Sequence, residues 1–166
     1  MRIALAVLLG LGLADPRRPG IGDPAPTLEL ETLEGRSFSP PRGSGATVVE
    51  FFATWCEPCH RALADLGAVR SHLAAPTRLI VVAVGEDATT VRRFLAANPL
   101  PAGAELALDR TGATARRWGQ DRFPTTFLLD GPGVIRHINR GWGPGYQARI
   151  LGWLRELVAR EPRREH

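Results

Sequence analysis

The chain has 166 residues, of which 44% are hydrophobic and 23% are charged. These proportions are ordinary for a globular protein, and the length fits one domain with a sizeable core. All 21 basic residues are arginine, and the net charge is +4. Because the arginines are scattered among 17 acidic residues rather than clustered, we do not expect nucleic-acid binding.

The first residues are typical of a signal peptide. Arg2 gives a positive start, residues 3–14 are mostly apolar, and Gly12-Leu13-Ala14 resembles a cleavage site. A membrane-spanning helix needs about 20 apolar residues, so the run is short for an anchor. We therefore expect residues 1–14 to be a signal peptide, 15–20 a spacer, and the protein to be exported. A disordered or buried N-terminal helix is the alternative.

The next strong signals are a strand followed by a helix. Residues 46–53 are almost continuously apolar and rich in β-branched and aromatic side chains, which favours a strand covered on both faces. Apolar side chains then recur at helical spacing, which predicts a helix from Cys56 to about residue 75. Pro58 falls in the first turn, where a missing N–H has no cost. The apolar side chains at helical spacing are those of Ala62, Leu63, Leu66, Val69 and Leu73.

The only two cysteines, Cys56 and Cys59, lie in this strand-to-helix junction. A disulfide between them would close a loop too short to stabilise the fold much. The spacing suits a bond that forms and breaks, because one thiol can always attack a mixed disulfide on the other. Zinc would need four ligands, and the four histidines have no finger spacing. We expect redox chemistry and no metal; a metal site and an inert pair are the alternatives.

The helix N-terminus assigns different roles to the two thiols. Its free N–H groups and its dipole favour a thiolate on Cys56, the expected nucleophile. Cys59, one turn into the helix, should be more buried and act as the resolving thiol. The charge of Glu57 disfavours the thiolate, so Glu57 and Pro58 should tune the pair towards a less oxidising potential. Trp55 should cover the pair from solvent.

A carboxylate interrupts the apolar strand at Glu50, among Val48, Val49, Phe51 and Phe52. Burying an unpaired charge is expensive, so a buried Glu50 would have a raised pKa and stay protonated. Six residues before Cys56, it could lie under the cysteines and exchange protons with Cys59. The alternative is a side chain that faces water or pairs with an arginine.

The remaining elements alternate between strands and helices. We expect strands at 78–85, 105–108, 125–129 and 134–139, and helices at 88–97, 111–118 and 146–160. This order implies right-handed crossovers and a partly parallel sheet. The last helix carries an apolar stripe that should pack on the sheet, and residues 161–166 should fray. The stripe consists of Ile150, Trp153, Leu154, Leu157 and Val158.

Four segments carry a family resemblance. Residues 49–59, with their Trp-Cys-Glu-Pro-Cys sequence, resemble the active-site strand and motif of the thioredoxin superfamily. Residues 22–26, 34–38 and 123–130 are similar to the opening motif, first hairpin turn and cis-proline strand of its TlpA/ResA-like branch. The resemblance covers residues 21–160. It implies a three-layer α/β/α fold with a central mixed sheet, an N-terminal hairpin and a central helix–strand insertion.

The resemblance also implies an activity. Glu50 matches the family's buried acid, and a cis Phe123–Pro124 bond would lie against the cysteines and expose backbone to a substrate strand. The family consists of exported thiol–disulfide oxidoreductases that need no cofactor. Apocytochrome c or copper-site proteins would be substrates, a membrane protein would donate electrons, and a monomer is expected. Ala62 departs from relatives that carry an acid near this position, so a substrate preference tied to that acid does not transfer.

Three other functions remain open from the sequence. A copper chaperone of the same fold usually has wider cysteine spacing and a histidine near the site. A peroxiredoxin-like peroxidase needs a peroxidatic cysteine after a Pro-x-x-x-Thr type segment, which is absent. A disulfide oxidase or isomerase would share every motif named above, because the Glu-Pro dipeptide only biases the potential.

Overall fold

The computed structural model describes residues 18–40, 43, 45–72 and 77–160. The expected signal peptide, the first half of the spacer and the frayed tail lie outside these residues. In chain order, the elements are β1 (Leu30–Glu31), β2 (Ser37–Phe38), β3 (Thr47–Phe52), α1 (Glu57–Ser71), β4 (Arg78–Val84), α2 (Ala88–Ala97), β5 (Glu105–Asp109), α3 (Ala113–Arg117), β6 (Thr125–Leu129), β7 (Ile135–Arg140) and α4 (Tyr146–Arg160). Within the described part of the chain, no helix is long and apolar enough to cross a membrane.

The strands form one mixed sheet in the order β2-β1-β5-β4-β3-β6-β7. β3, β4 and β5 are parallel to one another, and β6 and β7 extend the sheet in antiparallel fashion from β3. The expected N-terminal hairpin is present as β1–β2, which pairs with β5 at the opposite side of the sheet. The predicted insertion therefore supplies β5, the strand that joins the hairpin to the central strands.

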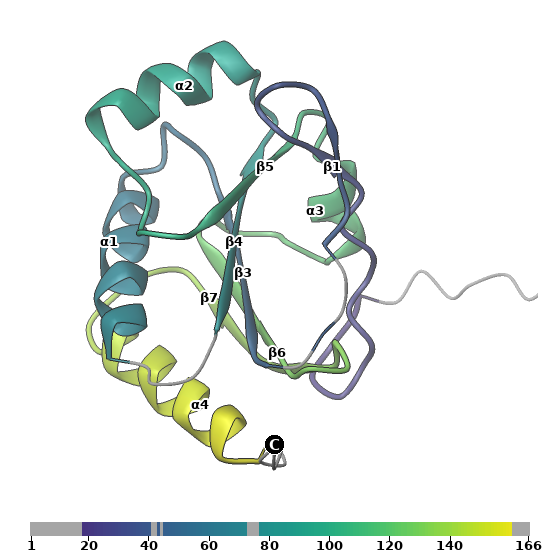
Figure 1. Cartoon of the computed structure of the whole chain (residues 1–166), viewed down its shortest axis with the longest axis vertical. Coiled ribbons are helices and arrows are strands. Elements are labelled where there is room, and N and C mark those ends of the chain that lie inside the picture. The colour runs from purple at the N-terminus through teal and green to yellow at the C-terminus, as the bar shows by residue number, and fades with distance from the viewer. Residues whose placement is uncertain (1–17, 41–42, 44, 73–76, 161–166) are drawn as a thin grey trace, which may run out of the picture.

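Helices cover both faces of the sheet, as the three-layer prediction requires. Figure 1 shows α1, α2 and α4 on one side of the sheet and α3 on the other. Side chains of β3 alternate between two hydrophobic clusters. Val48 and Phe52 pack with α1 and α4, whereas Val49 and Phe51 pack with Trp118, which ends α3. Because both faces of β3 are covered, the side chains of this central strand are shielded from solvent.

The stripe predicted for the last helix lies against this core. Ile150, Leu154 and Leu157 are buried, and Trp153 and Val158 are half-buried at its margin. The pattern places α4 beside α1, so both helices cover the same half of the sheet.

Several boundaries differ from those predicted. α1 ends at Ser71, and residues 73–75, which the prediction included, are outside the described chain. α3 is shorter than the expected 111–118, because Gly112 adopts a left-handed conformation (φ 70°) directly before its first turn. β5 and β7 each extend one residue further, and Val134 forms an isolated bridge with Pro24 instead of joining β7.

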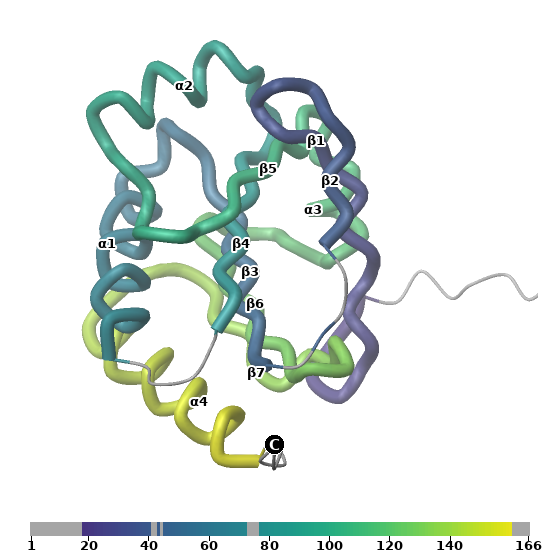
Figure 2. The backbone as a smooth tube through the Cα atoms, in the orientation of Figure 1, coloured from purple at the N-terminus to yellow at the C-terminus, as the bar shows by residue number. Residues whose placement is uncertain are grey.

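The N-terminal segment is held against the rest of the domain. Gly22 and Ala25 donate backbone hydrogen bonds to Ile135 and Gly133 (2.8 and 2.9 Å) beside the β6–β7 turn. Glu29 then accepts a hydrogen bond from Thr114 of α3 at its backbone oxygen (3.4 Å). Figure 2 shows this segment passing along the α3 side of the sheet before it enters β1.

Candidate active site

The cysteine pair lies at the N-terminus of α1, directly after β3. Cys56 is the N-cap residue, with extended backbone angles (φ −90°, ψ 97°), and Glu57 and Pro58 form the start of the first turn. Cys56 and Cys59 are joined by a disulfide with a Cα–Cα distance of 5.3 Å. Cys59 is fully buried and Cys56 is 5% exposed. Attack from outside is therefore easier at Cys56, the sulfur expected to be the nucleophile.

Three hydrogen bonds to Thr54 fix the turn between β3 and α1. Glu86, which follows β4, accepts hydrogen bonds from the backbone N–H (2.8 Å) and the hydroxyl of Thr54. His60 Nε2 donates to the Thr54 carbonyl oxygen at 2.8 Å. These contacts hold the residues before Cys56 in one conformation. Sequence analysis did not identify Glu86 as part of this site. The residue lies 32 positions after Thr54, and no local sequence pattern shows that the two are in contact.

Glu57 lies at the surface, where the side chains of Arg61 and His60 of α1 can reach it. Arg61 donates two hydrogen bonds to its Oε1 (both 3.2 Å), and His60 Nδ1 lies 3.5 Å from its Oε2. The Glu57 side chain is 68% exposed, so solvent screens these pairs. Its negative charge beside Cys56 is thus partly offset by Arg61.

Trp55, which directly precedes Cys56, contacts a second aromatic side chain, that of Phe123. Trp55 is 71% exposed, and its ring meets that of Phe123 edge-on, with the centroids 5.4 Å apart and the planes at 87°. The Phe123–Pro124 bond is cis. The Pro124 carbonyl oxygen accepts a hydrogen bond from Gly141 N–H (2.7 Å), which ties the start of β6 to the end of β7. Trp55 and Phe123 therefore form an aromatic platform at the surface near Cys56.

Glu50 is buried in the centre of the sheet, and the alternative of a water-facing side chain is wrong. It is 0% exposed and lies on the face of β3 shared with Val48 and Phe52, whose cluster contains Cys59. Neither carboxylate oxygen has a hydrogen-bond partner within the described residues. Burial raises the pKa of Glu50 to about 8, against a smaller lowering by the hydroxyls of Thr126 and Tyr146.

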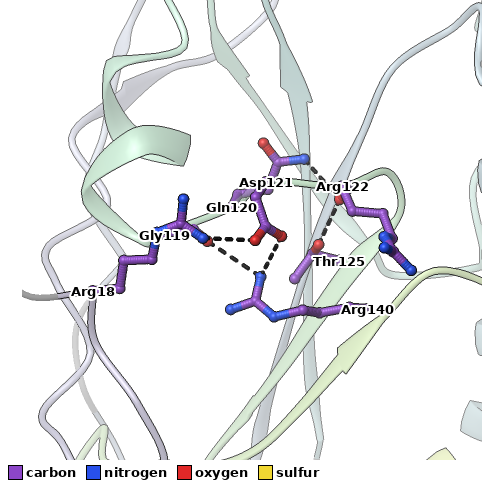
Figure 3. Close-up of polar contacts among 7 residues, drawn as sticks. All are labelled: Arg18, Gly119, Gln120, Asp121, Arg122, Thr125 and Arg140. Atoms are coloured by element: carbon purple, nitrogen blue, oxygen red, sulfur yellow. Dashed lines mark hydrogen bonds and ion pairs between the residues drawn. The ribbon is translucent and has the colours of Figure 1, made fainter.

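A second carboxylate organises the loop that leads into the cis-proline strand (Figure 3). Asp121 accepts hydrogen bonds from Arg18 (2.6 Å) and from Arg140 of β7 (2.7 Å). Arg140 also donates to the Gly119 carbonyl oxygen (3.2 Å), and the Arg122 carbonyl accepts from the side chains of Gln120 and Thr125. We call Asp121, Arg18 and Arg140 the arginine clamp. It joins the N-terminal segment, β7 and the loop that carries Phe123, and sequence analysis did not predict it.

Trp142, in the loop between β7 and α4, contacts α1 through its ring and its Nε1. Its Nε1 donates to Asp65 Oδ2 of α1 at 2.8 Å, and the Arg61 guanidinium lies 5.2 Å from its ring centroid. The loop between β7 and α4 is thereby attached to the active-site helix. In the part of the chain that the structure describes, no group of three or more His, Cys, Asp or Glu side chains is placed to hold a metal ion.

Comparison with known proteins agrees with this geometry. Residues 21–148 match the Redoxin family. A thiol:disulfide interchange protein DsbE homolog of Paracoccus denitrificans is 34% identical over 148 residues, which cover 85% of this chain and 79% of that protein. The thiol-disulfide oxidoreductase ResA of Geobacillus thermodenitrificans is 30% identical over 124 residues, covering 73% of this chain and 70% of that protein.

A solved structure extends the likeness to the fold. A thioredoxin-like protein from Porphyromonas gingivalis has a TM-score of 0.70 with 28% sequence identity, covering 85% of this chain and 95% of that one. The family match, the two relatives and the mixed sheet with a Cys-x-x-Cys at a helix N-terminus are mutually consistent. The chain therefore belongs to the Redoxin family, in the TlpA/ResA-like branch of the thioredoxin superfamily, and is a thiol–disulfide oxidoreductase.

Proposed function

We propose that this oxidoreductase reduces protein disulfides outside the cytoplasm, in the maturation of apocytochrome c or of copper-site proteins. The observation that carries the proposal is the unequal burial of the two cysteines at the N-terminus of α1, beside the aromatic platform. We assign Cys56 to react with the substrate and Cys59 to complete the exchange. The signal-peptide pattern of residues 1–14 and the relatives named ResA and DsbE support an exported reductant.

The reaction starts from the reduced pair. The Cys56 thiolate attacks one sulfur of a substrate disulfide, which breaks the substrate S–S bond and forms a mixed disulfide; the departing substrate sulfur takes up a proton. Cys59 then loses its proton and attacks Cys56 Sγ. The second substrate thiol leaves, and the Cys56–Cys59 disulfide remains. The substrate gains two electrons and two protons, and a membrane protein must supply two electrons to restore the dithiol.

Glu50 has the environment of a base for the second step. Cys59 is sealed from water, so its proton must pass to a group inside the protein. A catalytic base works best when its pKa lies near the operating pH, and burial places Glu50 in that range. We assign Glu50 to accept the Cys59 proton, which makes the thiolate that attacks Cys56.

We assign substrate binding to Trp55, Phe123 and Pro124. The aromatic platform offers apolar surface next to Cys56, and the chain at Phe123 can pair with an extended substrate segment. Glu57 and Pro58 tune the pair: the negative charge of Glu57 disfavours the Cys56 thiolate and hence favours a reducing potential. The catalytic cycle requires one chain only, a disulfide-bearing protein and an electron donor, with no metal or organic cofactor.

The test is to trap the mixed disulfide. Cys59→Ser should stop the reaction after the first step and accumulate a covalent complex with a disulfide-containing peptide, visible on a non-reducing gel. Cys56→Ser is the matched control, because its remaining thiol is buried and should form little complex. Complexes formed equally by both variants would contradict the assignment of Cys56 as the nucleophile, and their absence from both would contradict the exchange mechanism.

A further inference from the structure

The buried carboxyl of Glu50 has two hydroxyl groups as its polar neighbours. Thr126 is directly opposite Glu50 in the β3–β6 register. Its hydroxyl forms a hydrogen bond with the Tyr146 hydroxyl at 2.9 Å. Thr126 is 0% exposed and Tyr146 is 1% exposed. Three polar groups are thus enclosed together, yet both Glu50 oxygens lack a hydrogen-bond partner in the described chain.

This arrangement is unusual for a purely structural residue. Buried polar atoms nearly always find a partner, because an unpaired one is costly. The hydroxyls of Thr126 and Tyr146 lie close enough to Glu50 to lower its pKa, but the hydrogen bond that they form in this structure joins them to each other. Tyr146 is the first residue of α4, and burial followed by the charge of Glu50 raises its pKa well above the ordinary value. The Tyr146 hydroxyl therefore keeps its proton and remains a donor throughout the reaction.

The other groups packed near Glu50 are apolar or have partners of their own. From α1 come Cys59 and Asp65, and from α4 come Tyr146 and Arg149; both Asp65 and Arg149 act electrostatically on Tyr146. Asp65 accepts a hydrogen bond from Trp142 Nε1 (2.8 Å), and Arg149 donates one to Asn139 Oδ1 (3.0 Å). The β4 residue opposite Glu50 is Val81, which is apolar.

We propose that Thr126 and Tyr146 form a hydroxyl switch for Glu50, in which their hydroxyls bond each other while Glu50 is protonated and turn to donate to its carboxylate when it is ionised. The inference rests on the proposed role of Glu50 as the base for Cys59. Tyr146 and Thr126 are positioning residues, since they act on the cysteines only through Glu50. By stabilising the ionised carboxylate, they keep a fraction of Glu50 ready to accept a proton.

The proton transfer balances within the exchange reaction. The Cys59 S–H gives its proton to a Glu50 carboxylate oxygen, and the Tyr146 hydroxyl returns to Thr126. The Cys59 thiolate attacks Cys56 Sγ, the Cys56–substrate bond breaks, and the substrate sulfur leaves with the electron pair and is protonated by water. Glu50 then returns this proton to solvent, which replaces the proton that water gave to the substrate sulfur, and its carboxylate accepts the hydroxyl hydrogen bonds again.

The test is to titrate the Glu50 carboxyl by ¹³C NMR in the oxidised protein, a measurement that needs no enzyme activity. Tyr146→Phe should raise its midpoint by about one pH unit, because a hydrogen bond to a charged group is worth roughly that much. Thr126→Val should also raise it, whereas Thr126→Ser keeps the hydroxyl and should restore the wild-type midpoint. Ile150→Val, one turn along α4 and equally buried, controls for altered packing.

Unchanged midpoints in both Tyr146→Phe and Thr126→Val would overturn the hydroxyl switch. So would an equal shift in Ile150→Val, which would assign the effect to packing. Disulfide exchange by the same variants separates the switch from the proposed function. If the carboxyl shifts as expected and the pH profile of exchange shifts with it, both are supported. If the carboxyl shifts and exchange does not, the switch exists but Glu50 is not the base for Cys59.

Discussion

Two carboxylates, Glu50 in the central strand β3 and Asp121 in the loop before Phe123, are stabilised in opposite ways. Glu50 is enclosed in the sheet and has no hydrogen-bond partner in the described residues. Asp121 lies at the surface and is bonded by Arg18 and Arg140. Burial raises the pKa of Glu50 to about 8. Desolvation also raises the pKa of Asp121, but the Arg18 hydrogen bond and the charges of Arg140 and Arg18 outweigh it, so the pKa is lowered.

The difference separates a reactive group from a structural one. A carboxyl whose proton affinity lies near neutral pH can take and give a proton during a reaction. One held ionised by arginines cannot, but it can fix a loop. The molecule thus combines a buried carboxyl, on the face of β3 that packs against the cluster containing Cys59, with a surface loop whose carboxylate is held ionised by arginines.

The largest expected effect concerns folding stability and the substitution Glu50→Gln. Glu50 has a pKa near 4.5 when unfolded and about 8 when folded, so the folded state binds the extra proton between these values. Wild-type stability should therefore fall as the pH rises from about 4.5 to 8, by an amount on the order of 5 kcal/mol. Glu50→Gln removes this dependence and should be the more stable protein at pH 8. Urea denaturation across this pH range measures both curves, and parallel curves would contradict a buried, proton-binding Glu50.

The same substitution should slow disulfide exchange, because Gln accepts no proton. General-base contributions are typically of about 100-fold or more, and the step most affected should be release of substrate from the mixed disulfide. Stopped-flow mixing of the reduced protein with a disulfide peptide measures that step. An unchanged rate and an unchanged pH profile would exclude Glu50 from proton exchange, whatever its effect on stability.

The smallest effect is expected for Asp121→Asn. Its depressed pKa means that the arginine clamp stabilises the fold above the unfolded pKa of about 3.8, and that this contribution is lost as the pH falls through the folded value. The loss should be small, opposite in pH dependence to that of Glu50, and abolished by about 1 M salt. Arg140→Gln should have a similar, non-additive effect in denaturation experiments. An undiminished effect in high salt would show that packing, rather than charge, holds the loop.

The central strands, the main helices and the site of the cysteines were predictable because their signals are local. The apolar run of β3, the helical spacing of α1 and the Cys-x-x-Cys sequence are each contained in a short window. Burial of Glu50 was predictable for the same reason, since its strand neighbours are all apolar. The family resemblance implied the N-terminal hairpin and the strand of the insertion, but the pairing of β1 with β5 is known only from the structure.

The partners of the site residues were not predictable, because they are distant in sequence. Thr126 lies opposite Glu50 because of the β3–β6 register, and Tyr146 contacts Thr126 from helix α4. Arg18 and Asp121 are 103 residues apart, and Glu86 reaches Thr54 across a strand crossover. Periodicity identifies which face of an element is buried, but it does not specify which polar groups meet there.

The measurement that tests the proposed function most directly is the reduction potential of the Cys56–Cys59 pair, obtained by equilibration with a thiol buffer and gel-shift labelling of free thiols. We predict a value near or below about −270 mV, the range of thioredoxin, as a reductant of protein disulfides requires. A value near about −120 mV, the range of strong disulfide oxidants, would contradict the reductant and assign the protein to disulfide formation.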